Sequence, residues 1–286
     1  MTNRAKSPPI DRAYRKPKLK LPPGACDTHF HFIGPQEQFP LKPDHVFSQL
    51  EFEDTPAEDW LIMQDAMGLS RGVLVNSMMY GHNYEIVLNG LCRFPERLRA
   101  IIAPWSKITD RELEILTKAG VVGARFAHRL DPVLDERLVA RVAEHGWSAS
   151  YLGNIPDWRP KILKSPGRFV IEHAGHPPTA KGLDSPEFKF VLQCLDTGRC
   201  WVKISARFSA EDDFPFADTK PFVQKLVAHA PERIVWCSDW PHPQYFRPMP
   251  NDADLVDLML DWVPDETARN HIFVDNPAEC FGFPKP

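Results

Sequence analysis

Two histidines, His29 and His31, stand two positions apart behind a short apolar run in the stretch ACDTHFHFIG, residues 25–34. On a β-strand, positions i and i+2 point to the same face, so both imidazoles are directed at one place. Imidazoles arranged in this way bind a metal ion or exchange hydrogen bonds and protons with a substrate. The spacing therefore indicates either a metal site or a catalytic site, and the rest of the chain has to decide between them.

The elements that would position these histidines are short runs of apolar and β-branched residues, which are typical of parallel strands buried on both faces. Segments with helical start and stop signals separate most of them. In TDRELEILTKAG, for example, Thr109 and Glu112 have capping-box spacing and Gly120 stands at the stop position. Strand and helix alternate about eight times without a break in composition. The eight predicted strands are 25–31, 71–77, 98–105, 121–128, 147–153, 168–175, 200–207 and 234–240.

This alternation predicts an α/β fold, a (β/α)₈ barrel that forms a single domain over residues 23–286. A doubly wound open sheet is the alternative, although the first predicted strand lacks the glycine-rich turn that this fold would want. Residues 1–22 are rich in charges and prolines and lack the apolar run of a signal peptide. We expect an extended N-terminal arm there, packed on the outside of the barrel or on a neighbouring subunit, and a homo-oligomer stays open.

The composition excludes several classes of partner. The 286 residues are 43% hydrophobic and 25% charged, with a formal net charge of −4, as in an ordinary soluble globular protein. This balance gives no reason to propose nucleic acid or an anionic membrane surface as a partner. The six cysteines are scattered and form no C-x-x-C pair, so a reduced cytoplasmic protein is expected.

Polar side chains end most of the apolar runs. In a (β/α)₈ barrel the carboxyl ends of the strands form the mouth of the active site. Each such residue alone is commonly a surface or capping group, but together they are costly for folding and natural for a catalytic mouth. In chain order they are His29, His31, Asn76, Ser77, Arg125, His128, Arg129, Tyr151, His173, His176, Ser205, Arg207, Asp239 and His242.

Three motifs, ACDTHFHFIG, FVIEHAGHP and VWCSDWPHP, occur in an order that resembles the amidohydrolase superfamily, of the amidohydrolase-2 type. The similarity is to its branch of 2-pyrone-4,6-dicarboxylate lactonases and muconolactone-type hydrolases, and it runs from about Pro22 to NPAECFGF. It implies a distorted (β/α)₈ barrel that hydrolyses a small ring ester. By position, Asp239 matches the general base, and His29, His31 and His173 match the active-site histidines.

The resemblance also implies a substrate-binding set. The positions that hold the carboxylates and carbonyl of the substrate in this branch correspond to Arg125, Arg129, Tyr151 and Arg207. The strand-end residues Ser77, His176 and His242 complete the predicted set. His176 stands where the branch has an arginine, and RFAHRLDP is one residue shorter than its counterpart, so the identity of the lactone stays open.

The resemblance also bears on whether the protein binds a metal ion. Many metal-dependent members carry a carboxylate or modified lysine on the fourth strand, or a histidine on the fifth. Here the fourth strand ends in Arg125 and the fifth in Tyr151. We therefore expect no cofactor. A single zinc ion is the alternative, with ligands drawn from His29, His31, His173 and Asp239.

The arginines suggest the chemistry of the substrate. A guanidinium group suits bidentate capture of carboxylate or sulfonate oxygens, and three of them without evident partner carboxylates in these motifs favour a dianion. Their field would keep Asp239 ionised, so that it can take a proton from an attacking water. The histidines would then donate hydrogen bonds to the oxyanion that forms.

The sequence therefore predicts a carboxylic-ester hydrolase that opens a small anionic lactone in aromatic-compound degradation, either 2-pyrone-4,6-dicarboxylate or a carboxylated or sulfonated muconolactone. Three alternatives remain. They are a zinc-dependent decarboxylase of the same superfamily, a sugar-lactone hydrolase, and a barrel that binds an anion without turnover.

Overall fold

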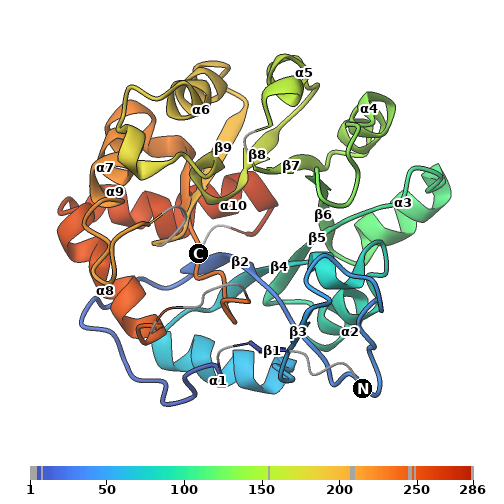
Figure 1. Cartoon of the computed structure of the whole chain (residues 1–286), viewed down its shortest axis with the longest axis horizontal. Helices are drawn as coiled ribbons and strands as arrows, with labels where there is room; N and C mark the ends of the chain where they lie inside the picture. Colours follow the sequence, from blue (N-terminus) through green and yellow to red (C-terminus); the bar gives the residue numbers. More distant parts are fainter. Residues whose placement is uncertain are drawn as a thin grey trace.

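Eight parallel strands form a nearly closed barrel with helices around its outside in the computed structural model (Figure 1). The structure describes residues 5–7, 9–153, 155–206, 210–243, 247 and 249–284. Neighbouring strands follow one another in chain order, which confirms the predicted barrel and excludes the doubly wound sheet. The strands are β2 (Cys26–Phe30), β4 (Arg71–Val75), β5 (Leu98–Ile102), β6 (Val121–Ala127), β7 (Ser148–Leu152), β8 (Phe169–Ile171), β9 (Cys200–Ile204) and β10 (Ile234–Trp236).

The helices between the strands begin and end where the local sequence dictates. The capping box predicted at Thr109 and Glu112 is present at the start of α3. Helices that separate the strands, as the start and stop signals predict, include α3 (Asp110–Lys118), α4 (Glu136–Glu144), α6 (Pro186–Asp196), α7 (Lys220–His229) and α8 (Asp252–Trp262). The structure adds α1 (Ala57–Met67), α2 (Glu85–Arg93), α5 (Arg159–Leu163), α9 (Glu266–Asn270), the π-helical turn η6 (His271–Asp275) and α10 (Asn276–Phe281).

The barrel closes along a seam between β2 and the segment that follows β10. The backbone N–H of Asp239 donates to the carbonyl of His29, and the N–H of His31 donates to the carbonyl of Trp240, each at 2.9 Å. Beside them, the buried carboxylate of Asp27 accepts hydrogen bonds from the backbone N–H and the hydroxyl of Ser238. The seam therefore fixes the H-x-H pair and Asp239 against each other through main-chain contacts.

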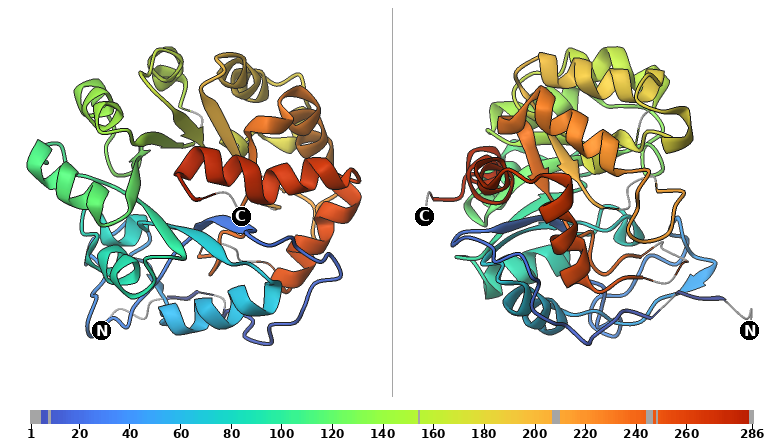
Figure 2. Two further views of the ribbon diagram at one scale, coloured as in Figure 1. Left: turned by 180° about the vertical axis from the view of Figure 1, so that it is seen from behind. Right: turned by 90° about the vertical axis from the view of Figure 1, so that its left-hand side faces the viewer.

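The chain from α9 to α10 closes the other end of the barrel. Figure 2 shows this helical segment crossing the end of the barrel. Phe281 and Phe283 pack there in one apolar cluster with Cys26, Val73 and Trp201. Since Cys26 begins β2, this segment covers the amino ends of the strands, and the carboxyl ends are left for a site.

The N-terminal arm lies across α1 and α8 on the outside of its own barrel. Its β1 (Ala5–Lys6) pairs in parallel with β3 (Leu50–Glu51). Further along, Arg12 forms an ion pair with Asp59 of α1 at 2.9 Å, and the backbone N–H of Leu19 donates to Asp257 of α8. Over the described parts of the chain, no helix has both the length and the apolar character that a membrane crossing requires.

Gly72 of β4 pairs with Asp27 of β2 at a point where only a glycine fits. A Cβ atom there would lie 2.6 Å from Phe30 and 2.9 Å from Trp60, so the stacked rings would have to move. We expect Gly72→Ala to lower the free energy of unfolding by about 1–3 kcal/mol, measured by urea denaturation. The control is Ser70→Ala, at an exposed position two residues away, which should stay within about 0.5 kcal/mol of the parent. Equal stability of the two variants would contradict this account of the β2–β4 packing.

Candidate active site

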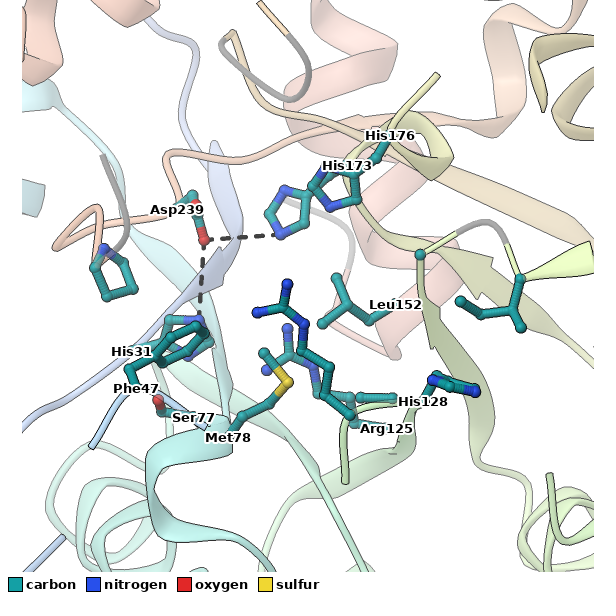
Figure 3. A pocket seen from close by; sticks show the side chains of 15 residues that line it. His31, Phe47, Ser77, Met78, Arg125, His128, Leu152, His173, His176 and Asp239 are labelled. Carbon is teal, nitrogen blue, oxygen red and sulfur yellow. Dashed lines mark ion pairs between the residues drawn. The ribbon is translucent and has the colours of Figure 1, made fainter. Parts of the chain in front are cut away.

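A cavity of about 450 Å³ opens at the carboxyl ends of the strands, where the sequence places the site. Figure 3 shows side chains from most strands of the barrel directed into it. Seven of the predicted site residues line the cavity, namely His31, Ser77, Arg125, Arg129, His173, His176 and Asp239. The wall is completed by apolar and small residues and by one further histidine, which are Phe47, Met78, Ala127, His128, Leu152, Gly153, Ile155 and Pro243.

Asp239 stands opposite three imidazoles. Its Oδ1 lies 3.7 Å from Nε2 of His29, 3.9 Å from Nε2 of His31 and 3.7 Å from Nε2 of His173. The last two contacts are drawn in Figure 3. The carboxylate side chain is 15% exposed, whereas His29 is fully buried behind the other two rings. The structure thus brings together the four residues that the sequence assigned to catalysis.

The loops after β8 and β10 hold these residues in unusual backbone conformations. Asp239 has φ = 62° and His173 has φ = 50°, and His176 and His242 also have positive φ. Residues other than glycine adopt this region at a cost of order 1–3 kcal/mol each, and such conformations cluster at functional sites. The seam and the barrel must therefore supply the contacts that keep both loops in place.

The hydrogen bonds of His31 and His173 define what each ring can do. Nδ1 of His31 donates to the carbonyl oxygen of Val75 at 2.7 Å. Burial, followed by the charge of Arg125, lowers the pKa of His31 to about 4 against the opposing effect of Asp239. Burial likewise lowers the pKa of His173 to about 3, and its Nδ1 lies 2.9 Å from the hydroxyl of Ser205. Both rings are therefore neutral at pH 7, and Nε2 of His31 is an acceptor.

Arg125 is not an uncommitted anion receptor. Its Nε and one terminal nitrogen donate to Glu172 at 3.0 and 2.8 Å, and the other terminal nitrogen donates to the backbone carbonyl of Asn76. Burial acts to raise the pKa of Glu172, but the charges of Arg125 and Lys203 outweigh it and lower this pKa to about 2. The expectation that the cavity arginines lack partner carboxylates is therefore wrong for Arg125. It lines the cavity as half of a buried ion pair, with two N–H groups beyond these three bonds.

Arg129 and the histidines around it form the outer rim. Arg129 is exposed and its guanidinium lies over the ring of Phe47, 5.8 Å from its centroid. The ring of His128 lies near that of Trp158 at a tilt, and His176 lies against His173. Ser77 accepts a hydrogen bond from the backbone N–H of Met79 and lines the cavity beside Met78. The rim is positively charged and partly apolar, which suits a flat anionic molecule.

Two predicted substrate-binding residues lie outside the cavity lining. Ser150 bonds Glu172 inside the barrel, so its neighbour Tyr151 faces outward, because side chains alternate along a strand. Tyr151 is fully buried against Phe169, with its hydroxyl 2.5 Å from the hydroxyl of Ser165. The prediction that Tyr151 contacts the substrate is therefore not supported by its position.

His242 is also turned away from the cavity. Its Nε2 lies 3.0 Å from a carboxylate oxygen of Asp252, at the start of α8, and both side chains are buried. This pair attaches the loop after β10 to the outer helical layer. Arg207, the remaining predicted member of the set, lies outside the described residues.

Sequence reasoning missed two buried charged residues, Glu172 and Lys203. Glu172 was passed over as the neighbour of His173 in FVIEHAG, and Lys203 as part of the apolar run CWVKISAR. A signal was present for Lys203. Lys203 stands two positions before Ser205, so strand alternation places both on the inner face. Glu172 is adjacent to His173, and both lie inside because β8 ends at Ile171 and the backbone turns at His173.

Some of the side chains are placed as metal ligands would be, but the surroundings of one of them are not those of a metal ligand. Nε2 of His29 and Nε2 of His31 are 3.2 Å apart, and His29, His173 and Asp239 offer ligand atoms within 4.8 Å of one another. A ligating histidine normally donates its other ring N–H to a carbonyl or carboxylate. His31 meets this condition through Val75, but Nδ1 of His29 faces the amine of Lys203 at 3.5 Å. The environment of His29 therefore does not fit a metal ligand, and no catalytic step is assigned to a metal.

The comparisons with known proteins agree with this geometry. The chain is 32% identical to a 4-sulfomuconolactone hydrolase of Hydrogenophaga intermedia over 93% of this chain and 91% of the relative. A 4-sulfomuconolactone hydrolase of Rhizobium radiobacter is 33% identical, over 98% and 94%. A 2-pyrone-4,6-dicarboxylate hydrolase of Comamonas testosteroni is 29% identical, over 93% and 92%.

Solved structures show the same architecture. An Agrobacterium tumefaciens protein, ATU3138, superposes with a TM-score of 0.83 at 28% identity and covers 94% of this chain and 100% of its own. A Burkholderia multivorans amidohydrolase solved with bound zinc superposes with a TM-score of 0.66 at 16% identity and covers 91% of this chain and 99% of its own. At this identity the likeness shows the fold alone. The family model described as Amidohydrolase matches residues 26–283. From this match and its relatives, the chain belongs to the amidohydrolase family.

Proposed function

We propose that this protein is a lactonase that hydrolyses a small anionic ring ester, either 2-pyrone-4,6-dicarboxylate or a carboxylated or sulfonated muconolactone, in the degradation of aromatic compounds. The observation that carries the proposal is the position of Asp239, whose carboxylate faces three imidazoles at 3.7–3.9 Å at the edge of a cavity lined by two arginines. The relatives that act on such lactones support the choice of substrate class.

Substrate binding begins at the arginines. Arg129 on the rim has a planar fork of donors that fits a carboxylate or sulfonate. Arg125 has two N–H groups beyond its bonds to Glu172 and Asn76, and it lines the inner part of the cavity. These two groups would hold the acidic substituents of the ring and place the lactone carbonyl near Asp239.

Asp239 then acts as the general base. It removes a proton from a water molecule while the water oxygen attacks the lactone carbonyl carbon. The resulting oxyanion needs a hydrogen-bond donor. Neutral His173 provides one from Nε2 when the hydroxyl of Ser205 donates to its Nδ1, and Arg125 provides others.

Breakdown of the tetrahedral intermediate completes the reaction. The carbonyl reforms, the bond from the carbonyl carbon to the ring oxygen breaks, and the ring oxygen departs, as an enolate from a pyrone or as an alkoxide from a muconolactone. The protonated Asp239 returns its proton to that oxygen, so the carboxylate is regenerated and the net reaction consumes one water. His31 is neutral and accepts at Nε2, so it does not donate to the oxyanion. This differs from the expectation from sequence, in which the histidines donate hydrogen bonds to that oxygen.

All six cysteines are free, five of them buried. This is the state expected in a reducing compartment, and we assign the enzyme to the cytoplasm.

The substrate assignment is tested by absorbance on protein stripped of metals with a chelator. We expect rapid loss of the pyrone absorbance of 2-pyrone-4,6-dicarboxylate, or turnover of 4-sulfomuconolactone in a parallel assay. Addition of zinc should not raise the rate. Failure on both lactones, with and without zinc, would overturn the proposed function.

Asp239→Asn should lower kcat by about 10²- to 10⁴-fold, because the amide cannot accept the proton of the attacking water. Affinity for an unreactive aromatic dicarboxylate, measured by calorimetry, should be retained, since the arginines are unchanged. Asp184→Asn, on an exposed carboxylate at the start of α6, is the matched control and should have the parent rate. An unchanged kcat in Asp239→Asn would show that another group is the base.

The low pKa values of His31 and His173, about 4 and about 3, predict that neither ring is protonated between pH 5 and 8. We expect the NMR signals of their ring Cε1–H groups, assigned from His31→Gln and His173→Gln, to keep constant shifts over this range. Free imidazole in the same tube titrates and serves as the internal reference. A midpoint near pH 6.5, the value of an unperturbed histidine, would contradict the neutral-ring mechanism.

A further inference from the structure

A buried lysine lies directly behind the H-x-H pair. Lys203 is on β9 and is fully buried, and its Nζ is 3.5 Å from Nδ1 of His29. On its other side the same amine lies 5.4 Å from the centroid of the Phe281 ring. Lys203 therefore stands between α10 and His29, which is the one of the three imidazoles facing Asp239 that does not line the cavity.

Two neighbours of Lys203 oppose the effect of burial on its ammonium group. Burial lowers the pKa of Lys203, and the carboxylate of Glu172 acts in the opposite direction. The ring of Phe281 is also placed as in a cation–π contact, which stabilises a desolvated cation.

An ammonium group has three donors and no acceptor. It can therefore meet Nδ1 of His29 only as a donor to the lone pair of that nitrogen, and the ring proton of His29 must then be on Nε2. Nε2 of His29 lies 3.2 Å from Nε2 of His31, which is free to accept because Nδ1 of His31 donates to Val75. The result is a chain in which every proton points the same way, from Lys203 through both imidazoles to a backbone carbonyl.

This polarity is the reverse of what a metal site needs. A histidine that binds a metal through Nε2 must keep a lone pair there and carry its proton on Nδ1, where a carbonyl or carboxylate accepts it. His29 has its proton on the wrong nitrogen, and the lone pair of His31 is already used by His29. A fixed cation behind the pair would also repel a second one.

We propose that Lys203 is a positioning residue that locks His29 in its Nε2–H form, so that the H-x-H pair works as a hydrogen-bonded chain and cannot become a zinc site while Lys203 is present. The proposal concerns the site assigned above to lactone hydrolysis but does not depend on which substrate that site takes.

The test measures zinc affinity and ring protonation without any substrate. Chelator-stripped parent protein, Lys203→Gln and Lys203→Met are titrated with zinc against a chromophoric chelator. Because the amide oxygen of glutamine can accept from Nδ1–H of His29, we expect Lys203→Gln to bind zinc about 10- to 100-fold more tightly than the parent. Lys203→Met, which removes the donor without supplying an acceptor, should fall between them. The control is Lys189→Gln on the exposed face of α6, which should equal the parent.

A second readout is the position of the ring proton of His29, and its measurement on the parent protein requires no variant to fold. Long-range ¹⁵N–¹H NMR of the parent protein should show the ring proton of His29 on Nε2, and in Lys203→Gln with zinc the proton should move to Nδ1. A parent protein with the proton on Nδ1, or zinc affinity equal in the parent and both Lys203 variants, would overturn the proposal. Failure to open either lactone would count against the proposed function alone, because neither zinc affinity nor ring protonation requires turnover.

Discussion

The site depends on the hydrogen-bonded seam that closes the barrel between β2 and the segment after β10. The N–H of Asp239 donates to the carbonyl of His29, so these two residues are joined through the main chain as well as facing each other through their side chains. The carboxylate of Asp27 fixes the same seam from the outer side through Ser238. Burial raises the pKa of Asp27 to about 7, and the hydrogen bonds from Ser238 oppose this rise.

The buried charges around the seam set the state of the histidines. Arg125 and Lys203 place two cations next to the imidazoles, and burial removes the water that would otherwise stabilise an imidazolium. Asp239 acts in the opposite direction but does not outweigh them. The rings therefore stay neutral, and each has a defined direction of hydrogen bonding. Glu172 keeps this cluster from accumulating unbalanced positive charge, which explains a carboxylate inside a site built for anions.

Much of the fold and the centre of the site were predictable from the sequence, since apolar runs mark strands and barrel topology gathers their carboxyl ends. That rule places His29, His31, His173 and Asp239 at the mouth of the barrel together with other polar residues, and the resemblance to the amidohydrolases singles these four out. The side of the strand was harder to predict. Tyr151 and Ser150 are neighbours on β7, and only the contact of Ser150 with Glu172 shows which of them faces inward. Lys203 could be placed inside the barrel by alternation, but its role rests on a 3.5 Å contact with a residue 174 positions away, which no local pattern contains.

The long separation in sequence between these contacting residues affects how the enzyme folds. The seam joins residues 211 positions apart, and the helix that covers Lys203 comes later still in the chain. Contacts between such distant segments form late in folding, because the entropy of closing the long loop is lost before the contact is gained. During synthesis from the N-terminus, the histidine pair emerges early but has neither its base nor its lysine. The groups around the cavity are therefore complete only after most of the chain has been synthesised.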